Sequence, residues 1–345
     1  MIKQKNNNKR KVFEGENAVF NFLKPDSLGP TAVVELPKEL NPFQKDGVRI
    51  FVKLLQLVPL FNIKSLPSYE MLSALSKKEL SKIKNLVEYS SGNTVLSLTV
   101  LSKHFGIPRM HAILTPDVPE HKKRLLRLLG TNIMISHGPS CPDVSAQIGG
   151  VYEAKKMGAK SGWHNLHQYI NRANLKAGEK YIGKELWNQF GEDLSIFISS
   201  IGTAGTISGA APYLKKKNNK IKILGTCIKE GSSIPGPRGE KHIHKLAFPW
   251  EKEVDEVISM NALRSFKTSL KLIRLGIFAG PSTGMQLEAL FAKLQEYKKK
   301  GKLKELKNKN GEIVACFLAC DTMFPYIDDY FSILPENLFP KVKDL

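Results

Sequence analysis

Short apolar runs alternate with longer amphipathic segments along most of this chain. Strand-like runs rich in Val, Ile and Leu occupy residues 48–55, 85–90, 110–116, 132–137, 193–202, 220–228 and 311–321. Apolar positions recur at helical spacing over residues 68–75, 77–86, 94–106, 119–130, 206–218, 261–276 and 285–299. The first pattern indicates strands buried in a sheet, and the second indicates helices that pack on it.

Strands separated by whole helices predict right-handed crossovers and parallel sheets with helices on both faces. The chain divides near residues 139–170, a glycine-rich and mixed stretch between two such blocks. We therefore predict the α/β class, with two three-layer α/β/α domains built on mostly parallel sheets. Ligands of such folds bind at the carboxyl ends of the strands, so the polar loops there are the candidate sites.

The length of 345 residues suits one large domain or two ordinary ones. Lys and Arg total 52 against 32 Asp and Glu, which gives a net charge of +20. Such a charge is a reason to consider nucleic acid or a membrane surface as a partner. The lysines cluster at the start and at 215–220 and 298–311 with few aromatic residues between them, which indicates solvated surface. No apolar run is long enough to span a bilayer, and the basic start lacks the apolar stretch of a secretory signal. We expect a cytoplasmic protein with no specific nucleic-acid partner and no membrane partner.

Four cysteines, Cys141, Cys227, Cys316 and Cys320, show neither a disulfide framework nor zinc-site spacing. Cys316 and Cys320 lie four apart in an apolar run, where such residues share one face of a strand. Buried thiols behave as small apolar groups, so the interpretation is core packing, and no metal site is expected.

Three loops combine glycine with hydroxyl residues before a predicted helix. They are Ser-Ser-Gly-Asn-Thr at 90–94, Gly-Thr-Ala-Gly-Thr at 202–206 and Gly-Pro-Ser-Thr-Gly at 280–284. A helix cap explains any one of them, because Ser, Thr and Asn satisfy the free amides of a first turn. The same amides and the helix dipole also favour an anion. The second loop is neither a Walker loop nor a dinucleotide fingerprint. Three such loops at strand–helix junctions favour a small anionic ligand.

In their order these loops resemble those of the fold type II pyridoxal-phosphate enzymes, in the branch of cysteine synthase and cystathionine β-synthase. VEYSSGNT (87–94) is similar to the family's Thr-Ser-Gly-Asn-Thr loop, 202–206 to its Gly-Thr-Gly-Gly-Thr phosphate loop, and 280–284 to its Gly-x-Ser-Ser-Gly. Residues 168–187 resemble a segment that begins Gln-Phe-x-Asn-Pro-Ala-Asn and ends Gly-Pro-Glu-Ile-Trp. The resemblance covers roughly residues 28 to 335. It implies a fold like the tryptophan synthase β-subunit and pyridoxal 5′-phosphate as the cofactor.

The resemblance places the Schiff-base lysine at Lys64, within VRIFVKLLQLVPLFNIKSLPSYEML. Lys45 in NPFQKDG is a rival because an Asn-Pro precedes it. Lys45 lies 48 residues before Asn93, however, whereas Lys64 lies 29 residues before it, as the family pattern requires. The family's usual Lys-Asp-Arg is Lys64-Ser65-Leu66 here, which removes a structural carboxylate.

The resemblance also implies roles for the loop residues. Asn93 would hydrogen-bond the phenolic oxygen of the cofactor, and Thr322 would donate to its pyridine nitrogen without forcing it to be protonated. The groups that would hold the substrate carboxylate are Ser90, Ser91, Gly92, Thr94 and Gln168. Those that would hold the cofactor phosphate are Gly202, Thr203, Ala204, Gly205 and Thr206. Ala204 replaces a family glycine, which the loop tolerates only if that position does not need a positive φ.

The implied activity is β-replacement on an O-activated serine-type amino acid through an aminoacrylate intermediate, as in cysteine synthase, with Lys64 as the base at Cα. β-Elimination, of the serine or threonine dehydratase or cysteine desulfhydrase type, is an open alternative, as is a nucleophile other than sulfide. A third alternative is an inactive relative of these enzymes that works by binding a partner.

The resemblance also implies a homodimer. We expect a smaller movable domain at 69–167, a larger cofactor domain from 28–68 and 168–335, and tails at 1–27 and 336–345.

Overall fold

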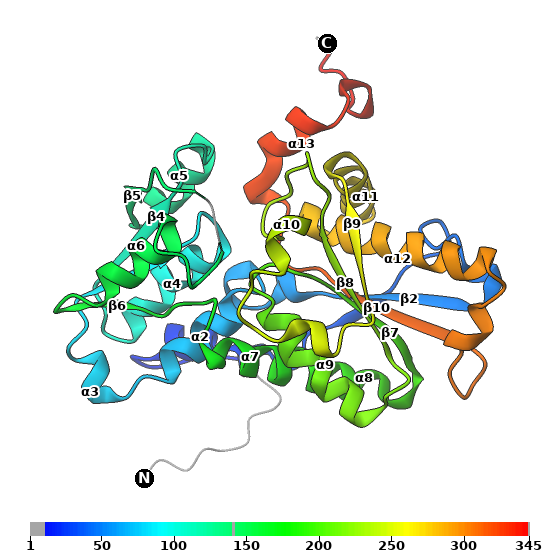
Figure 1. The fold of residues 1–345 in the computed structure, drawn as a ribbon, viewed down its shortest axis with the longest axis horizontal. Helices are drawn as coiled ribbons and strands as arrows, with labels where there is room; N and C mark the ends of the chain where they lie inside the picture. The colour runs from blue at the N-terminus through cyan, green and yellow to red at the C-terminus, as the bar shows by residue number, and fades with distance from the viewer. Residues whose placement is uncertain (1–10, 140–141, 344–345) are drawn as a thin grey trace.

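The computed structural model describes residues 11–139 and 142–343 and shows two α/β domains, each built around its own sheet (Figure 1). The larger sheet has the order β1-β2-β10-β7-β8-β9, and its neighbouring strands are parallel except for the β1–β2 pair. The smaller sheet has the order β5-β4-β3-β6 and is parallel throughout. The α/β class and the mostly parallel sheets expected from the sequence are confirmed.

The strands of the larger sheet are β1 (Val33–Glu35), β2 (Val48–Lys53), β7 (Leu194–Ser200), β8 (Lys222–Ile228), β9 (Glu256–Met260) and β10 (Ile313–Leu318). Those of the smaller sheet are β3 (Asn85–Tyr89), β4 (Arg109–Leu114), β5 (Asn132–Ile135) and β6 (Trp163–Asn165). The α-helices are α1 (Ala18–Leu23), α2 (Ser65–Ser73), α3 (Lys77–Leu80), α4 (Asn93–His104), α5 (Glu120–Leu128), α6 (Gly149–Gly158), α7 (Arg172–Gly178), α8 (Lys184–Phe190), α9 (Gly205–Lys217), α10 (Glu240–Ile243), α11 (Ala262–Arg274), α12 (Pro281–Lys299) and α13 (Ile327–Ile333).

Alternate side chains of each sheet face different helices. In the smaller sheet, Leu86 packs toward α4, whereas Val87 packs toward α6 on the other face. In the larger sheet, Phe317 packs with the side chains of α12, whereas Phe197 and Leu318 pack with those of α9. Figure 1 shows α12 and α9 on opposite sides of these strands. Both faces of each sheet are thus covered, as parallel sheets require.

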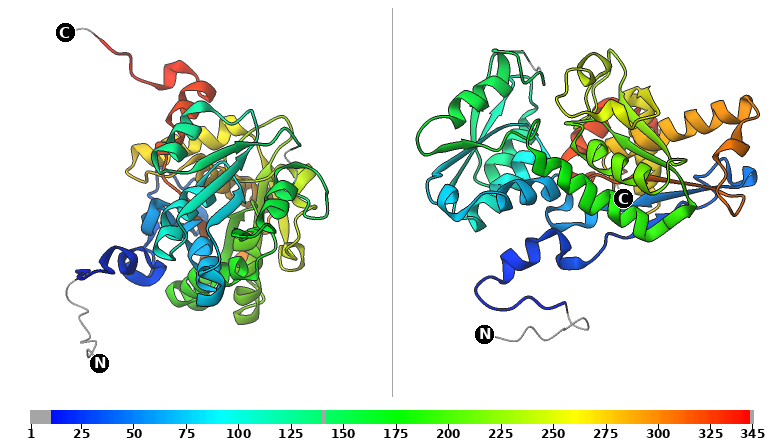
Figure 2. Two further views of the ribbon diagram at one scale, coloured as in Figure 1. Left: turned by 90° about the vertical axis from the view of Figure 1, so that its left-hand side faces the viewer. Right: turned by 60° about the horizontal axis from the view of Figure 1, so that its bottom comes forward.

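The amino-terminal segment differs from the tail expected for residues 1–27. Residues 1–10 lie outside the described part of the chain, but α1 is folded against the smaller domain (Figure 2). Phe20 stacks on His104 with ring centroids 5.6 Å apart, and Leu23 is buried in the core of that domain. The basic residues behind that expectation lie before α1, which itself carries no charge, so the described part of this segment is folded rather than a free tail.

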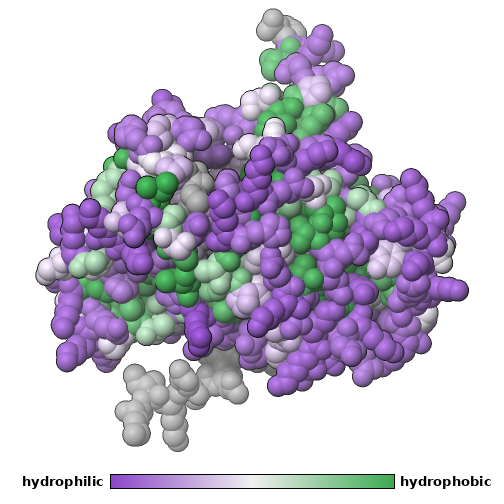
Figure 3. Space-filling model, viewed as in Figure 1, coloured by the Kyte–Doolittle hydropathy of each residue, from purple (hydrophilic) through white to green (hydrophobic). Residues whose placement is uncertain are grey.

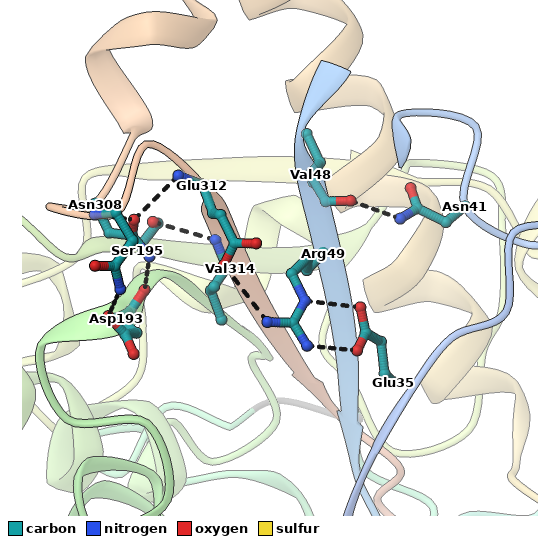
Figure 4. A network of polar contacts seen from close by, with 10 residues as sticks. Glu35, Asn41, Val48, Arg49, Asp193, Ser195, Asn308, Glu312 and Val314 are labelled. Atoms are coloured by element: carbon teal, nitrogen blue, oxygen red, sulfur yellow. Dashed lines mark hydrogen bonds and ion pairs between the residues drawn. The ribbon is translucent and has the colours of Figure 1, made fainter. Parts of the chain in front are cut away.

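Polar contacts tie together the amino ends of β2, β7 and β10 and the carboxyl end of the antiparallel β1 (Figure 4). The Arg49 guanidinium on β2 donates to both carboxylate oxygens of Glu35 on β1, at 2.9 and 2.7 Å, and reaches Glu312 before β10 at 3.4 Å. The hydroxyl of Ser195 on β7 accepts from the Val314 amide at 3.2 Å. These contacts hold the edge of the sheet opposite to the one where ligands bind.

Hydrophilic side chains cover most of the face shown in Figure 3, in keeping with the many lysines. An apolar strip lies over α13, where Ile327 and Phe331 are exposed. Phe331 also stacks on Phe339, so the expected C-terminal tail at 336–345 contacts the fold as well. None of the helices in residues 11–139 and 142–343 has the length and apolar character needed to cross a membrane.

A buried ion pair fastens α8 to the last residue of β2. The side chain of Lys53 has no exposed surface, and its Nζ lies 2.6 Å from Glu185 Oε2. The ammonium also donates to Thr31 O at 3.2 Å and to Gln189 Oε1 at 3.1 Å. A lysine can occupy this position because each donor of its charged head has an acceptor.

Replacing Glu185 by Ala removes the anion and leaves the Lys53 ammonium buried. We expect a loss of about 3–5 kcal/mol in the free energy of unfolding, the usual cost of an uncompensated buried charge. Urea unfolding followed by circular dichroism measures this loss.

The matched control is Glu192→Ala, because Glu192 pairs with Lys309 at 2.9 Å on the surface, where both side chains are 64% exposed. That variant should unfold at the same urea midpoint as the unmodified protein. If Glu185→Ala were equally unaffected, the pair would not be a stabilising element of the fold.

Candidate active site

A cavity of about 550 Å³ lies between the two domains, at the carboxyl ends of β3, β7 and β10. The sequence-predicted residues that line it are Lys64, Ser90, Ser91, Gly92, Asn93, Thr94, Gln168, Gly202, Thr203 and Thr206. Ser282 of the third glycine loop lines it as well. Ala204, Gly205 and Thr322 lie outside this lining. The three loops that the sequence places far apart therefore meet around one space.

Backbone pairing holds Lys64 at the end of β10. The Ile63 amide donates to Cys320 O at 2.6 Å, and Asn62 forms an antiparallel bridge with Asp321. Lys64 follows directly and begins the turn into α2. Because these contacts involve backbone atoms, they position the lysine independently of the side chains around it.

The surroundings of Lys64 favour a neutral amine. Burial is the largest cause and lowers its pKa, the Arg238 cation lowers it further, and the opposing influence of Cys320 and Asp321 is smaller. The rival Lys45 is exposed in a 3₁₀ turn (Gln44–Asp46), away from the cavity lining. The choice of Lys64 over Lys45 thus agrees with the geometry.

The loop at 90–94 leaves the first turn of α4 open toward the cavity. Within the described residues no side chain caps α4, whose N-cap residue is Gly92. The Ser90 hydroxyl accepts from the Gly92 amide at 3.3 Å, which folds the loop back on itself before the helix starts. Free amides at a helix start attract an anion, so the geometry supports a cradle rather than a simple cap.

Gln168 links two of the loops. Its Oε1 accepts from the Thr94 hydroxyl at 2.8 Å, and its Nε2 donates to Tyr89 O at 3.2 Å. The Asn174 amide donates to Gln168 O at 2.7 Å and to the Thr203 hydroxyl at 3.2 Å. A continuous chain of hydrogen bonds therefore joins the loop at 90–94 to the loop at 202–206.

Glu88 supports this chain from inside the smaller sheet and is a residue that the sequence analysis missed. Its carboxylate accepts from the Gln168 amide at 3.4 Å and from Asn165 Nδ2 at 3.3 Å. Burial raises its pKa to about 7 against the opposing hydrogen bonds. It stands two residues before Ser90 in an apolar strand, and a lone acid in such a strand is the signal that could have found it.

The second loop adopts a conformation that its sequence does not favour. Ala204 has a φ of 66°, so this position does use the left-handed region, which the family's glycine reaches without steric cost. Gly205 packs against Asn174, where an added Cβ would lie 2.2 Å from Oδ1. Ala204 and Gly205 thus shape the loop from behind, while Gly202, Thr203 and Thr206 present it to the cavity.

The strand-end residue that faces the cavity is Cys320 rather than Thr322. Thr322 instead forms an antiparallel bridge with Ala279, because the chain turns away after Asp321. The sequence analysis also took Cys316 and Cys320 as core thiols. Cys316 and Cys227 are buried, whereas Cys320 has one side in the core and one at the cavity, and Cys141 lies outside the described residues. Burial raises the pKa of Cys320 to about 11, so the group is a neutral thiol.

These groups fit pyridoxal phosphate. The cavity offers a buried amine for its aldehyde, an open helix start with Gly202, Thr203 and Thr206 for its phosphate, and a neutral thiol donor at Cys320 for its ring nitrogen. Asn93 lines the same cavity as the lysine.

Comparisons with known proteins show what this chain is similar to. A family model described as "Pyridoxal-phosphate dependent enzyme" matches residues 25–307. The cysteine synthase of Aquifex aeolicus is 28% identical over 281 residues, covering 79% of this chain and 84% of that protein. O-ureido-L-serine synthase superposes with a TM-score of 0.74 at 21% identity, covering 92% of this chain and 96% of that one. A hydrogen sulfide-producing enzyme of Fusobacterium nucleatum superposes with a TM-score of 0.71 at 21% identity, covering 91% of this chain and 99% of that one.

At 21% identity the two solved structures support the fold alone, which is the expected type II fold. The family match spans most of the chain and includes Lys64 and all three glycine loops. Its cofactor is pyridoxal 5′-phosphate, as the loops implied. The chain therefore belongs to the family of pyridoxal-phosphate dependent enzymes, among the relatives of cysteine synthase.

Proposed function

We propose that this protein catalyses β-replacement on an O-activated serine-type amino acid, in the manner of a cysteine synthase. The observation that carries the proposal is the open amino end of α4 beside Lys64 in one cavity. A carboxylate bound by the amides and hydroxyls of 90–94 would place the Cα and Cβ of an amino acid near the lysine. The similarity to cysteine synthases supports the same reaction class.

Lys64 would carry out the proton transfers of this reaction. When bound, pyridoxal phosphate supplies the electron sink that makes the Cα proton removable. Lys64 Nζ takes that proton, the leaving group departs from Cβ with the bonding electrons, and a nucleophile adds to Cβ before Lys64 returns the proton. An amine whose pKa is lowered by burial is able to accept a proton near neutral pH. Closure of the smaller domain over the bound carboxylate would exclude water.

The remaining contacts orient the reactants. Ser90, Ser91, Gly92, Thr94 and Gln168 would bind the substrate carboxylate, as the sequence resemblance implied. Gly202, Thr203 and Thr206 would bind the phosphate at the start of α9, with Ala204 and Gly205 shaping that loop. We assign the contact with the ring nitrogen to Cys320 in place of Thr322, because Cys320 faces the cavity.

β-Elimination is the second candidate, and the structural similarity to a hydrogen sulfide-producing enzyme favours it. Both reactions need the same lysine and the same carboxylate cradle, and they differ only in whether a nucleophile reaches Cβ. The homodimer and the cytoplasmic location stay predictions.

The test of the proposal is the visible absorption of the purified protein with pyridoxal phosphate, for the unmodified chain beside Lys64→Ala. We expect a yellow band that the variant loses or shifts, because the covalent bond to the lysine amine is gone. The control is Lys45→Ala, which should keep the band, since Lys45 is exposed outside the cavity. A protein that never binds the cofactor would support the inactive relative instead.

The loaded protein is then given O-acetylserine with and without sulfide, and cysteine and pyruvate are measured. Cysteine formed only with sulfide supports replacement. Pyruvate as the main product in the presence of sulfide would favour elimination. Lys64→Ala should form neither product.

Ala204→Gly should keep cofactor binding and raise the free energy of unfolding by up to about 1 kcal/mol. The relieved left-handed strain, about 1–2 kcal/mol, exceeds the entropic cost of a glycine, about 0.5–1 kcal/mol. The control is Ala210→Gly within α9, where the same change should destabilise by about 1 kcal/mol. Urea unfolding of the cofactor-free proteins measures both. Equal destabilisation by both changes would show that Ala204 is not strained.

Cys320→Ala should weaken the binding of pyridoxal phosphate about five- to tenfold, the usual effect of one lost hydrogen bond, while Cys320→Ser keeps a donor and most of the affinity. Thr322→Val should bind as the unmodified protein does, because Thr322 lies outside the cavity lining. Absorbance titration of the cofactor-free proteins gives the three dissociation constants. If only Thr322→Val lost affinity for pyridoxal phosphate, Thr322 would be the contact of the ring nitrogen, as the sequence resemblance implied.

A further inference from the structure

A carboxylate lies inside the cavity that neither the proposed reaction nor the resemblance uses. Asp321 follows Cys320 at the end of β10 and lines the cavity, yet it is only 4% exposed. Its backbone is held on two sides, by the bridge to Asn62 and by the Gly280 amide, which donates to Asp321 O at 2.9 Å. A carboxylate in such a place costs free energy, so its contacts call for an explanation.

Two donors converge on one oxygen of this carboxylate. Asn93 Nδ2 donates to Asp321 Oδ2 at 2.6 Å, and the Tyr326 hydroxyl donates to the same atom at 2.5 Å. Oδ1 is buried and has no hydrogen-bond partner among the described residues. The absence of a side chain at Gly280 makes the room, since an added Cβ there would lie 2.3 Å from Oδ1.

The contact with Asn93 fixes the direction of an amide. An asparagine side chain can turn over, because its oxygen and nitrogen are of similar size. A carboxylate is able only to accept, so Asp321 requires the NH₂ group of Asn93 to point toward it. The other acceptor of that NH₂ group among the described residues is the Tyr326 hydroxyl at 3.5 Å. That contact is at the long limit of a hydrogen bond, so a phenolate oxygen could take its place. Without Asp321, the amide could present its carbonyl oxygen instead, which repels a phenolate oxygen.

We infer that Asp321 is a positioning residue, which acts through Asn93 by holding its amide in the orientation that donates to the phenolic oxygen of the cofactor. The inference rests on the proposed function, which gives Asn93 that contact. Asn93 belongs to the smaller domain and Asp321 to the larger one. The orienting bond therefore exists only while the two domains hold these residues together.

The role requires the ionised carboxyl group. Burial raises the pKa of Asp321 to about 6, partly opposed by the hydrogen bonds from Tyr326 and Asn93. The carboxylate is thus present above about pH 6 and becomes protonated as the pH falls through that value, when it no longer constrains Asn93. The titratable groups around it are Lys64 before α2, Lys122 of α5, Cys320 after β10, Tyr326 before α13 and Tyr330 in α13.

The test is a double-mutant cycle on the affinity for pyridoxal phosphate, measured by absorbance titration of the cofactor-free full-length protein at pH 7.5. We expect Asp321→Ala and Asn93→Ala each to weaken binding about tenfold. The double variant should be no weaker than Asn93→Ala alone, because Asp321 acts through that amide. Additive losses of about a hundredfold would overturn the inference.

The pH profile separates positioning from packing. The affinity of the unmodified protein should fall about tenfold between pH 7.5 and pH 5 with an inflection near 6, and Asp321→Ala should lack that inflection. Tyr326→Phe is the control. It keeps the bond from Asn93 to Asp321 and loses the long contact of 3.5 Å between Asn93 and the Tyr326 hydroxyl. It should bind within twofold at pH 7.5, and its inflection should move to higher pH because the variant removes a hydrogen bond that lowers the pKa of Asp321. A tenfold loss in Tyr326→Phe at pH 7.5 would show a packing effect and overturn the inference.

If Asp321→Ala does not fold, Gly280→Ala serves in its place, because the added methyl group displaces the carboxylate while leaving it in the chain. It should reproduce the loss of affinity and again be non-additive with Asn93→Ala. A Gly280→Ala protein with full affinity would overturn the inference. The proposed function fails separately, in an unmodified protein without a band that depends on Lys64.

Discussion

The cavity depends on the backbone pairing of residues 62–63 with residues 320–321. The Ile63–Cys320 hydrogen bond and the Asn62–Asp321 bridge join the entry of α2 to the end of β10. Because β7 and β10 are parallel strands of one sheet, the loop after β7 reaches the same edge, and the loop after β3 lines the cavity from the smaller domain. The pairing supplies the wall that carries Lys64 and Cys320, and the loops of both domains supply the open helix starts that face it.

Burial then shifts the pKa values of the groups on that wall. It lowers the pKa of Lys64 and raises that of Asp321, so both groups move toward neutrality from opposite sides. Groups with such pKa values are the ones that exchange protons near neutral pH. Glu88 has a pKa raised to about 7 by the same cause, yet it lies outside the cavity lining and serves to hold Gln168. A shifted pKa alone therefore does not mark a residue that reacts, and geometry decides between the two roles.

The sequence predicted the long buried strands and the glycine loops well, because their signals are local. β10 is a continuous apolar run, β2 is a mostly apolar run that contains Arg49 and ends at Lys53, and the loop at 90–94 is recognisable by composition. β1, β6 and β9 were missed, since they are short and lie at the edges of their sheets or carry half-exposed side chains. Thr322 was misplaced because alternation along a strand says nothing once the chain has left the ladder. The contact between Asn93 and Asp321 joins two domains, and no local pattern encodes it.

Unfavourable backbone conformations gather at this one edge of the protein. Among the described residues, the non-glycine positions with positive φ are Leu60, Phe61, His167 and Ala204, and each adjoins a segment that lines the cavity. α4 and α9 begin there without side-chain caps, whereas the opposite edge of the larger sheet is closed by the contacts of Arg49. A ligand that satisfies the open amides removes part of this cost, so its binding free energy adds to the stability of the folded state. Local features that cost folding free energy therefore lie where ligand binding compensates for that cost. Such a place is where a functional site is expected.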